Sequence, residues 1–438
     1  MNTRASRRDS IRNAWKTTGD SGIPIHPTRA SVQAMQNLGC DMTAAQTLLA
    51  EAEALYRANR TDDLLVMMSK INALIADRLA EVRRDEPTSW QEYQKKLPTG
   101  FGLPPLRLPI AQRTYDDRIL GSWLGKCAGT ALGGPVEGWS RDQILREHTR
   151  IRTYVGTPQL VNDDTAYAPL ILHVLDQYGP TWTSQDLALE WLAHLPFAYT
   201  AEQSALDNIA AGVMPPESRW FRNPCGAWVG AQMRGEIHGL IAPASPRVAA
   251  ELAFRDACVS HYREGVDGEV YVAAATSLTV AGVPVEDALV ASLEHVPETS
   301  RIVETVHSTL DFCRRSEDES AVAEWIEQSF GGFHWIHAVP SLACAIAGLL
   351  LGKGDFERSL LATVHLGFDT DCTAGLVGAL LGASLGASSL PREWIEPLGE
   401  VLPTYVIGFD EIPFHELVRR TAMWGCRIAP AACSSAPA

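Results

Sequence analysis

The 438-residue sequence has no apolar run that approaches the roughly 18 residues needed to cross a bilayer. Its longest run, Leu342 to Leu351, is far shorter, so we expect no membrane-spanning segment. Positive charge is also scarce, because 37 Lys and Arg stand against 52 Asp and Glu and give a formal net charge of −15. Such a balance argues against direct nucleic-acid binding, although local dipoles and metal ions could still hold a small anionic ligand.

Paired cysteines are missing as well. The nine cysteines are scattered and none forms a C-x-x-C pair, which argues against structural zinc. An odd number of cysteines in a large chain without a secretory apolar segment predicts reduced thiols and a cytoplasmic location. An Arg- and Ser-rich N-terminus leaves an organellar transit peptide as the rival interpretation.

Composition divides the chain into four parts. Residues 1–40 are basic and poor in periodic apolar positions, which predicts a flexible arm. Residues 41–110 predict a helical hairpin followed by a Pro-rich linker, with a capping box at Thr43–Gln46 and Thr61 as the cap of the second helix. Residues 111–428 carry helical periodicity and little strict alternation, which predicts an all-α domain. Residues 429–438 lack charge and large apolar side chains and predict a disordered tail.

Small residues recur on two predicted helices. Glycine occupies every fourth position from 121 to 133, and a second face consists of Gly375, Gly378, Ala379, Gly382, Ala383 and Gly386. Because glycine costs about 1 kcal/mol relative to alanine inside a helix, we predict that both helices pack very close to their neighbours. Trp123 and Lys126 interrupt the first face, which excludes a membrane dimer motif.

Two acidic clusters precede apolar segments. Asp369 and Asp371 lead into a helix too apolar to solvate them, and Asp163 and Asp164 precede the apolar segment 166–175. Isolated carboxylates are usually paired or metal-bound when they are buried. We therefore predict one cation site to which the fold brings up to four carboxylates.

The motifs Asp117–Gly121, Ala131–Glu137, Asn162–Thr165 and Gly367–Asp371 together resemble the ADP-ribosylglycohydrolase family. The resemblance covers approximately residues 114 to 428 and implies a compact, multi-helix, all-α domain, to which the predicted hairpin is an N-terminal helical extension. It also implies a centre of one or two Mg²⁺ ions, with Mn²⁺ possible, which serves cleavage of the bond at ribose C1″ of ADP-ribose.

By matching positions, the resemblance implies six metal ligands: Asn162, Asp163, Asp164, Asp369, Asp371 and Cys372. The chain departs from the family pattern at three positions. Asn162 stands where Thr or Ser is usual, and Gly129-Thr130 stands where Gly-Asp is usual. Cys372 replaces a hydroxyl residue, and a thiol is a poor ligand for Mg²⁺. One ion would then bind weakly, bind at a shifted position or be replaced by a softer ion, or water or Thr373 would complete its coordination.

The resemblance also implies catalytic and substrate-binding positions. Glu137 matches a glutamate on a loop over the cleft, with a solvated loop residue as the alternative. The catalytic base is left open among Glu137, Asp163 and Asp164. The pyrophosphate is expected at helix N-termini and glycine-rich turns, and a core role is the alternative for the histidine of Ser260-His261. The expected substrate contacts are Gly133, Gly134, His261, Gly367 and Phe368.

Two other motifs give little support for a binding site. His334 and His337 lack a third zinc ligand at a recognisable spacing, so Trp335 between them indicates a cleft-lining or packing segment. The run Gly348–Lys353 is one residue short of a P-loop and lacks the Ser or Thr that should follow.

The first functional hypothesis is a metal-dependent glycosidase that acts on ADP-ribosylated protein or on a small ADP-ribosyl or nucleoside substrate. The changes at Thr130 and Cys372 leave a catalytically silent ADP-ribose-binding protein as the second. A third is a pathway enzyme acting on an NAD-derived metabolite, in which the helical extension selects a substrate or partner. The sequence names no partner for that extension, which could be a docking module or an appendage that covers the main domain.

Overall fold

In this computed structural model, residues 25–99, 102 and 104–433 are described, and within them the predicted all-α fold is confirmed. The described residues form 20 α-helices and one sheet of two short strands. None of these helices combines the length and the apolarity that a membrane span requires. The first 24 residues of the predicted basic arm and the end of the predicted tail lie outside the described residues.

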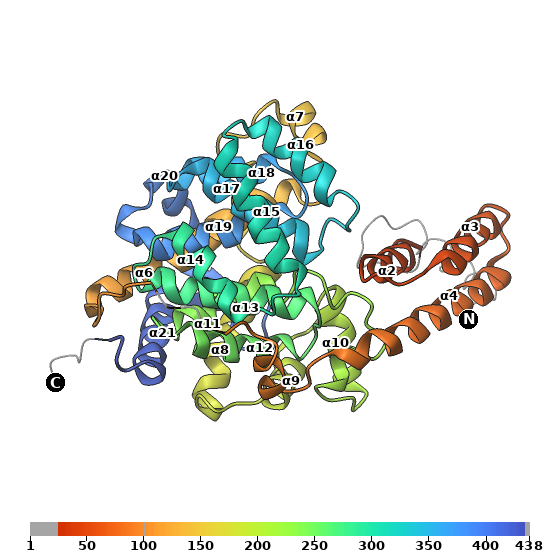
Figure 1. Ribbon diagram of the computed structural model, residues 1–438, viewed down its shortest axis with the longest axis horizontal. Helices are drawn as coiled ribbons and strands as arrows, with labels where there is room; N and C mark the ends of the chain where they lie inside the picture. Colours follow the sequence, from red (N-terminus) through yellow and green to blue (C-terminus); the bar gives the residue numbers. More distant parts are fainter. Residues whose placement is uncertain (1–24, 100–101, 103, 434–438) are drawn as a thin grey trace.

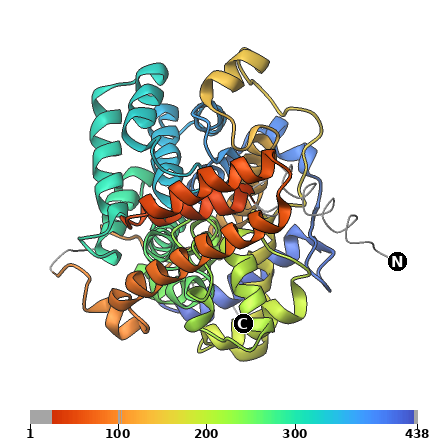
Figure 2. The same cartoon turned by 90° about the vertical axis from the view of Figure 1, so that its right-hand side faces the viewer.

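Four helices precede the main body: α2 (Ile25–Asn37), α3 (Thr43–Arg57), α4 (Thr61–Val82) and α5 (Trp90–Gln94). Figure 1 shows α2 to α4, in red and orange, standing out from one side of the body, and Figure 2 views that side directly. The predicted hairpin is the α3–α4 pair. Instead of an arm that continues to residue 40, the chain forms α2, because Val32 and Met35 are buried in an apolar cluster with the hairpin.

The caps of the hairpin differ from the prediction. Met42 precedes α3 and makes no side-chain cap, while the Asp41 carboxylate accepts a hydrogen bond from the Thr43 backbone N–H. Arg60 precedes α4, where Thr61 is the first helical residue and is buried. Packing of the apolar faces therefore stabilises these helices without the predicted capping box.

The body contains sixteen α-helices: α6 (Gln112–Gly133), α7 (Arg141–His148), α8 (Asp163–Tyr178), α9 (Ser184–His194), α10 (Thr200–Ala210), α11 (Glu236–Leu240), α12 (Pro246–Ala257), α13 (Glu264–Val280), α14 (Val285–Ala291), α15 (Arg301–Arg315), α16 (Glu319–Phe330), α17 (Ala338–Gly352), α18 (Phe356–His365), α19 (Thr370–Leu385), α20 (Arg392–Ile395) and α21 (Phe414–Ile428). Strands β1 (Val401–Pro403) and β2 (Glu411–Pro413) pair antiparallel, with Leu402 opposite Ile412.

Helices α13, α17 and α19 are apolar on nearly every face and lie inside the body, as such helices must. The end of the body differs from the predicted tail, since Ala432 is buried and its carbonyl accepts a hydrogen bond from the Ile110 backbone N–H. Ala429 and Ala432 are thus buried where the body begins, while Pro430 and Ala431 between them are exposed.

The two glycine-rich helices, α6 and α19, pack against each other. A Cβ added to Gly125 would lie 2.1 Å from the carbonyl oxygen of Gly378, and one added to Gly133 would lie 2.1 Å from that of Thr370. The prediction of very close packing is confirmed, and the two faces prove to be a single antiparallel seam. This seam holds the start of α19 beside the end of α6, where the acidic motifs lie.

Candidate functional site

The start of α19 and the loop after α6 form one side of the site. Asp369 immediately precedes α19, and Asp371 lies in its first turn. Backbone hydrogen bonds join the two segments, because Gly138 N–H donates to the carbonyl of Phe368 and Phe368 N–H donates to that of Trp139. Phe368 has a φ of +62°, which is unusual for a non-glycine residue and turns the chain into α19. These contacts hold the Glu137 loop over Asp369 and Asp371.

The start of α8 forms the opposite side. The Asn162 side-chain oxygen caps α8 by accepting a hydrogen bond from Asp164 N–H at 2.8 Å. Its amide nitrogen donates to Asp371 Oδ2 at 3.1 Å across 209 residues of sequence. Asn162 therefore joins the two acidic clusters, and its oxygen, the atom expected to ligate a metal, is engaged as a cap.

The clusters converge at the floor of a cavity of about 480 Å³. Six of its lining residues are site residues expected from the sequence, and Trp335, expected to line a cleft or pack, is also there. Most of its other walls come from segments with no recognisable motif. The lining residues are Glu137, Val161, Asn162, Asp163, Phe197, Tyr199, Thr200, Glu202, Val229, Gly230, Met233, Trp335, Ile336, Asp369, Asp371, Cys372 and Tyr405.

Three carboxylates of the acidic centre are not fully satisfied by the protein. One oxygen each of Asp164, Asp369 and Asp371 is buried without a hydrogen-bond donor. Burial, with Asp371 close by, raises the pKa of Asp163 to about 7 and raises the pKa values of Asp164 and Asp369 well above their ordinary range. The fold thus holds these groups together against their mutual repulsion, as expected of a site that binds a cation.

Lys126, the lysine beside this centre, does not balance it. Its ammonium group lies 2.6 Å from Glu236, and both side chains are almost completely buried. The charge of Lys126 lowers the pKa of Asp164, but burial and Asp371 outweigh this effect, so the acidic centre is only partly compensated.

Two groups of ligand atoms fit a metal ion. Oxygens of Glu137, Asp369 and Asp371 lie within 4.8 Å of one another, and so do ligand atoms of Asp164, Asp371 and Cys372. Asp371 belongs to both groups. The three unpartnered carboxylate oxygens are the hard donors that Mg²⁺ and Mn²⁺ prefer, so the residues fit such an ion.

Cys372 makes the second group unusual. Its thiol donates a hydrogen bond to Asp164 Oδ2 at 3.3 Å, and burial raises its pKa well above the ordinary value. The sulfur therefore remains a thiol in this arrangement and occupies one oxygen of Asp164 instead of offering a charged ligand.

The glycines and Phe368 expected to bind substrate have other surroundings. Gly133 packs on the backbone of Thr370, and a Cβ at Gly367 would lie 2.7 Å from the carbonyl oxygen of Trp139. A Cβ at Gly134 would meet nothing within 4 Å. These positions shape the two loops but do not line the cavity.

His261 does not line the cavity either, although its Nε2 lies 3.9 Å from the lining residue Glu202. Its side chain is fully buried, and its Nδ1 lies 2.7 Å from Ser260 Oγ. Burial and the nearby Arg234 lower the pKa of His261 well below its ordinary value. The geometry is that of a neutral core histidine, the alternative left open for it from the sequence.

Three aromatic rings of one wall, Phe197, Tyr199 and Tyr405, were not found from the sequence. Phe197 and Tyr405 stack with ring centroids 4.6 Å apart, and Tyr199 packs edge-on against Phe197. Trp335 and Ile336 lie on the segment between α16 and α17. The cavity thus combines an acidic floor with aromatic walls, which suits a sugar diol attached to a planar ring.

The N-terminal extension contacts this second wall segment. The side chain of Asn37, at the end of α2, donates to the carbonyl of Gly332 and accepts from the N–H of His334, both at 3.1 Å. Ala30 and Ala34 of α2 pack in a cluster with Trp228 and, at its edge, Ile336. The extension therefore supports residues that line the cavity.

A second buried charge cluster lies behind the cavity. Arg234 bonds to Glu202 at 2.8 Å and to Asp256 at 2.9 Å. His238 Nε2 lies 3.0 Å from Asp256 and 3.2 Å from Glu269. Burial would lower the pKa of His238, but the bonds to these two carboxylates outweigh it and raise it to about 9. The cluster has its own cations and needs none from outside.

Comparison with known proteins agrees with the sequence motifs and the fold. The model of the family described as ADP-ribosylglycohydrolase matches residues 111–423. The chain belongs to the ADP-ribosylglycohydrolase family. This membership confirms the resemblance and, at the general level, supports a glycosyl hydrolase of a family whose members depend on metal ions.

Two relatives are similar over most of their own length. An uncharacterized protein of Archaeoglobus fulgidus is 25% identical over 295 residues, which are 65% of this chain and 92% of that protein. The Escherichia coli uncharacterized protein YegU is 23% identical over 309 residues, 63% of this chain and 89% of that protein.

A solved structure, an ADP-ribosylglycohydrolase-related protein complex, matches with a TM-score of 0.52 and 23% identity. The match covers 72% of this chain and 99% of that one, and it supports the fold.

Proposed function

We propose that the chain is a metal-dependent hydrolase that cleaves the glycosidic bond at ribose C1 of an ADP-ribosyl or related nucleoside substrate. The observation that carries the proposal is the set of buried, unpartnered carboxylate oxygens of Asp369 and Asp371, which line an aromatic-walled cavity, and of the neighbouring Asp164. Residues 111–428 would form the catalytic unit, and residues 41–110 would be a structural extension of it.

Glu137, Asp164, Asp369 and Asp371 would hold one or two ions of Mg²⁺ or Mn²⁺. When bound, such an ion supplies Lewis acidity and orients the ribose hydroxyls at the acidic floor. Aromatic stacking on Phe197 or Tyr405 would hold the attached base or leaving group, which fixes the sugar for attack at C1.

Asp163 is the residue we assign as the general base. It lines the cavity but belongs to neither group of converging ligand atoms, so its carboxylate is left to take a proton from the attacking water. Asp164 is less suited, because it is fully buried and its Oδ2 accepts a hydrogen bond from the Cys372 thiol.

A nucleoside is the second candidate substrate class. Among the residues that line the described cavity there is no Lys, Arg or His. A diphosphate would have no cationic side chain in the cavity, whereas an uncharged nucleoside would need none. The same acidic floor and aromatic walls would serve both substrates.

Mass-spectrometric detection of products tests the proposal. The full chain is incubated with a panel of ADP-ribosylated proteins, small ADP-ribosyl conjugates and nucleosides, with Mg²⁺ or with chelator. We expect metal-dependent release of free ADP-ribose or ribose, lost in Asp369→Ala and kept in the control Asp77→Ala, which changes an exposed carboxylate of α4. Metal-bound protein that binds ADP-ribose and turns over no substrate would instead identify a silent binding protein.

The role of Asp163 has a separate test. We expect Asp163→Asn to lower kcat by about 10²- to 10⁴-fold while the protein still gains thermal stability from Mg²⁺. Loss of Mg²⁺ binding in this variant would make Asp163 a ligand and return the base to Glu137.

A further inference from the structure

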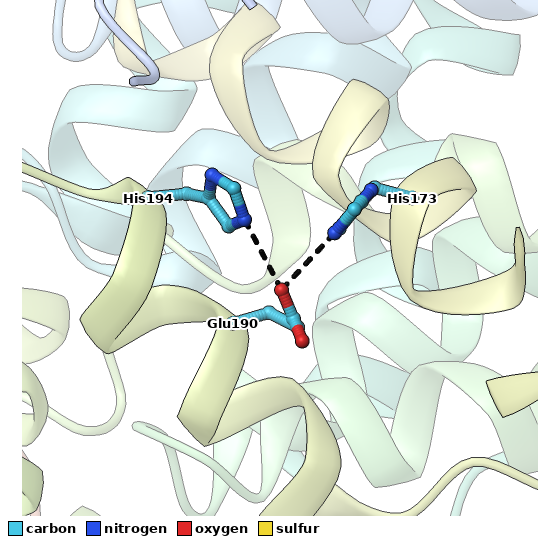
Figure 3. Close-up of side chains that lie close together, drawn as sticks. All are labelled: His173, Glu190 and His194. Carbon is cyan, nitrogen blue, oxygen red and sulfur yellow. Dashed lines mark hydrogen bonds and ion pairs between the residues drawn. The ribbon is translucent and has the colours of Figure 1, made fainter. Parts of the chain in front are cut away.

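A third group of metal-ligating side chains lies outside the acidic centre. His173 is on α8, and Glu190 and His194 are one turn apart on α9. Figure 3 shows both imidazoles pointing at the same carboxylate oxygen. His173 Nε2 lies 3.1 Å and His194 Nε2 lies 3.2 Å from Glu190 Oε2. Since Asp163 and His173 are ten residues apart on one helix, this group is about 15 Å from the acidic floor.

The protonation of His194 makes the arrangement informative. Its Nδ1 lies 2.8 Å from the carbonyl oxygen of Ile407, which can only accept, so Nδ1 carries the proton. In the neutral imidazole, Nε2 is then a bare lone pair that faces a carboxylate oxygen. These two acceptors repel each other unless a positive charge lies between them, which must be either a proton, carried by His194 or by Glu190, or a metal ion.

The rest of the geometry also fits a metal ion. Two ligands that bind a tetrahedral Zn²⁺ at its usual bond lengths lie about 3.3 Å apart, close to the observed separations from Glu190 Oε2. The remaining oxygen of Glu190 accepts a hydrogen bond from Tyr178 at 2.7 Å. Such outer contacts on a histidine and a carboxylate orient metal ligands.

The group is also accessible. The side chains of His173, Glu190 and His194 are 20%, 14% and 22% exposed, so an ion can enter and a water molecule can complete its coordination. Two imidazoles and one carboxylate suit Zn²⁺ better than Mg²⁺, which prefers oxygen ligands and keeps several waters.

We propose that His173, Glu190 and His194 form a zinc site that joins α8, α9 and the loop 404–410. Two hydrogen bonds already join that loop to α9. The Ile407 backbone N–H donates to the His194 carbonyl, and the Ile407 carbonyl accepts from His194 Nδ1. Phe409 packs edge-on against both imidazoles. Tyr405 of the same loop lines the catalytic cavity, so the zinc ion would hold a cavity wall in place without touching the substrate.

Zinc analysis of the full chain tests this site, with ZnCl₂ as the probe and excess Mg²⁺ to occupy the acidic centre. After dialysis we expect wild type to retain one zinc ion per chain. The affinity should fall about a hundredfold in His173→Gln and in His194→Gln, and about tenfold in Tyr178→Phe. The controls His415→Gln, an exposed imidazole on α21, and Asp371→Asn, in the acidic centre, should keep the zinc.

Equal zinc retention in the histidine variants and wild type would overturn the proposal, as would loss of zinc in Asp371→Asn alone. A second measurement does not depend on the folding of any variant. Zinc added to chelator-treated, Mg²⁺-supplied wild type should raise its Tm, and an unchanged Tm would show that a proton, and not a metal ion, occupies the group.

Discussion

Two buried charge clusters lie side by side in this molecule, and they are balanced in opposite ways. Behind the cavity, Arg234 and His238 face three carboxylates, and burial next to Asp256 raises the pKa of one of them, Glu269, to about 8. That group is therefore mostly protonated at neutral pH, and the cluster is close to neutral. At the cavity floor the carboxylates have no such partners.

The difference supports a structural role for the first cluster and the functional role that we propose for the second. Buried charges are tolerated when they are paired, and leaving them unpaired costs several kcal/mol each. The carboxylates of the first cluster are paired with cationic side chains of the same cluster, and the whole cluster is buried in the fold. In the function that we propose, the second would meet this condition only when a cation binds from outside, and it borders the cavity in which a substrate would reach that cation.

Removing the arginine should break the first cluster. Arg234→Met leaves Glu202 and Asp256 buried without their main cation, so we expect the free energy of unfolding to fall by about 3–5 kcal/mol. Urea denaturation measures this change. Arg419→Met, which breaks a surface pair with Glu416, is the matched control and should change stability by less than about 1 kcal/mol. If Arg234→Met loses no more stability than the control, the proposed difference between the two clusters is wrong.

Neutralising a carboxylate should change the free energy of unfolding in opposite directions in the two clusters. In chelator-treated protein, Asp371→Asn removes a repelling charge and should raise the free energy of unfolding by about 1 kcal/mol. Asp256→Asn removes the partner of both Arg234 and His238 and should lower it by more than that. Denaturation of the two variants side by side decides the matter, and a shift of the same sign in both would contradict the comparison.

Restoring a hydroxyl at position 372 should strengthen Mg²⁺ binding at the acidic centre. Cys372→Thr replaces a protonated thiol with an oxygen that hard ions accept, so we expect Mg²⁺ to bind up to about tenfold more tightly. Calorimetric titration with Mg²⁺ measures the effect. Cys344→Thr, a buried thiol on α17, serves as the control for a changed cysteine elsewhere in the core and should leave the affinity unaltered.

The balanced cluster should also show in the pH dependence of stability. The pKa of His238 rises from 6.5 to about 9 on folding, so its contribution is fully present below pH 6.5 and is lost as the pH rises through about 9. The raised pKa of Glu269 has the same sign. With saturating Mg²⁺, the free energy of unfolding should therefore fall between pH 6.5 and 9, and His238→Gln should reduce that fall. An equal fall in the variant would exclude His238 as its source.

Much of the fold could be predicted because its signals are local. Helical periodicity predicted the all-α class, and glycine at every fourth position on α6 predicted close packing. That α6 and α19 pack against each other could not be predicted, since a small-residue face does not specify its partner. The arm and tail predictions differ from the structure at 25–37 and 429–433 because a few small or apolar side chains suffice when a neighbour covers them.

The candidate site was predictable only where its residues are contiguous. Asp163-Asp164 and Asp369–Asp371 stand out as charged pairs before apolar helices. Phe197 and Tyr405 are single aromatic residues in ordinary segments, and only the fold brings them together. His173 likewise gives no signal beside Glu190 and His194, whose one-turn spacing on α9 is a common pattern.

The thermal stability of chelator-treated protein on addition of MgCl₂, against NaCl of equal ionic strength, tests the central claim most directly. We predict that Mg²⁺ raises the Tm of wild type, because it supplies the charge that the acidic floor lacks, and that this rise disappears in Asp371→Asn. An unchanged wild-type Tm, or an equal rise in Asp371→Asn, would contradict the claim that these carboxylates await a cation.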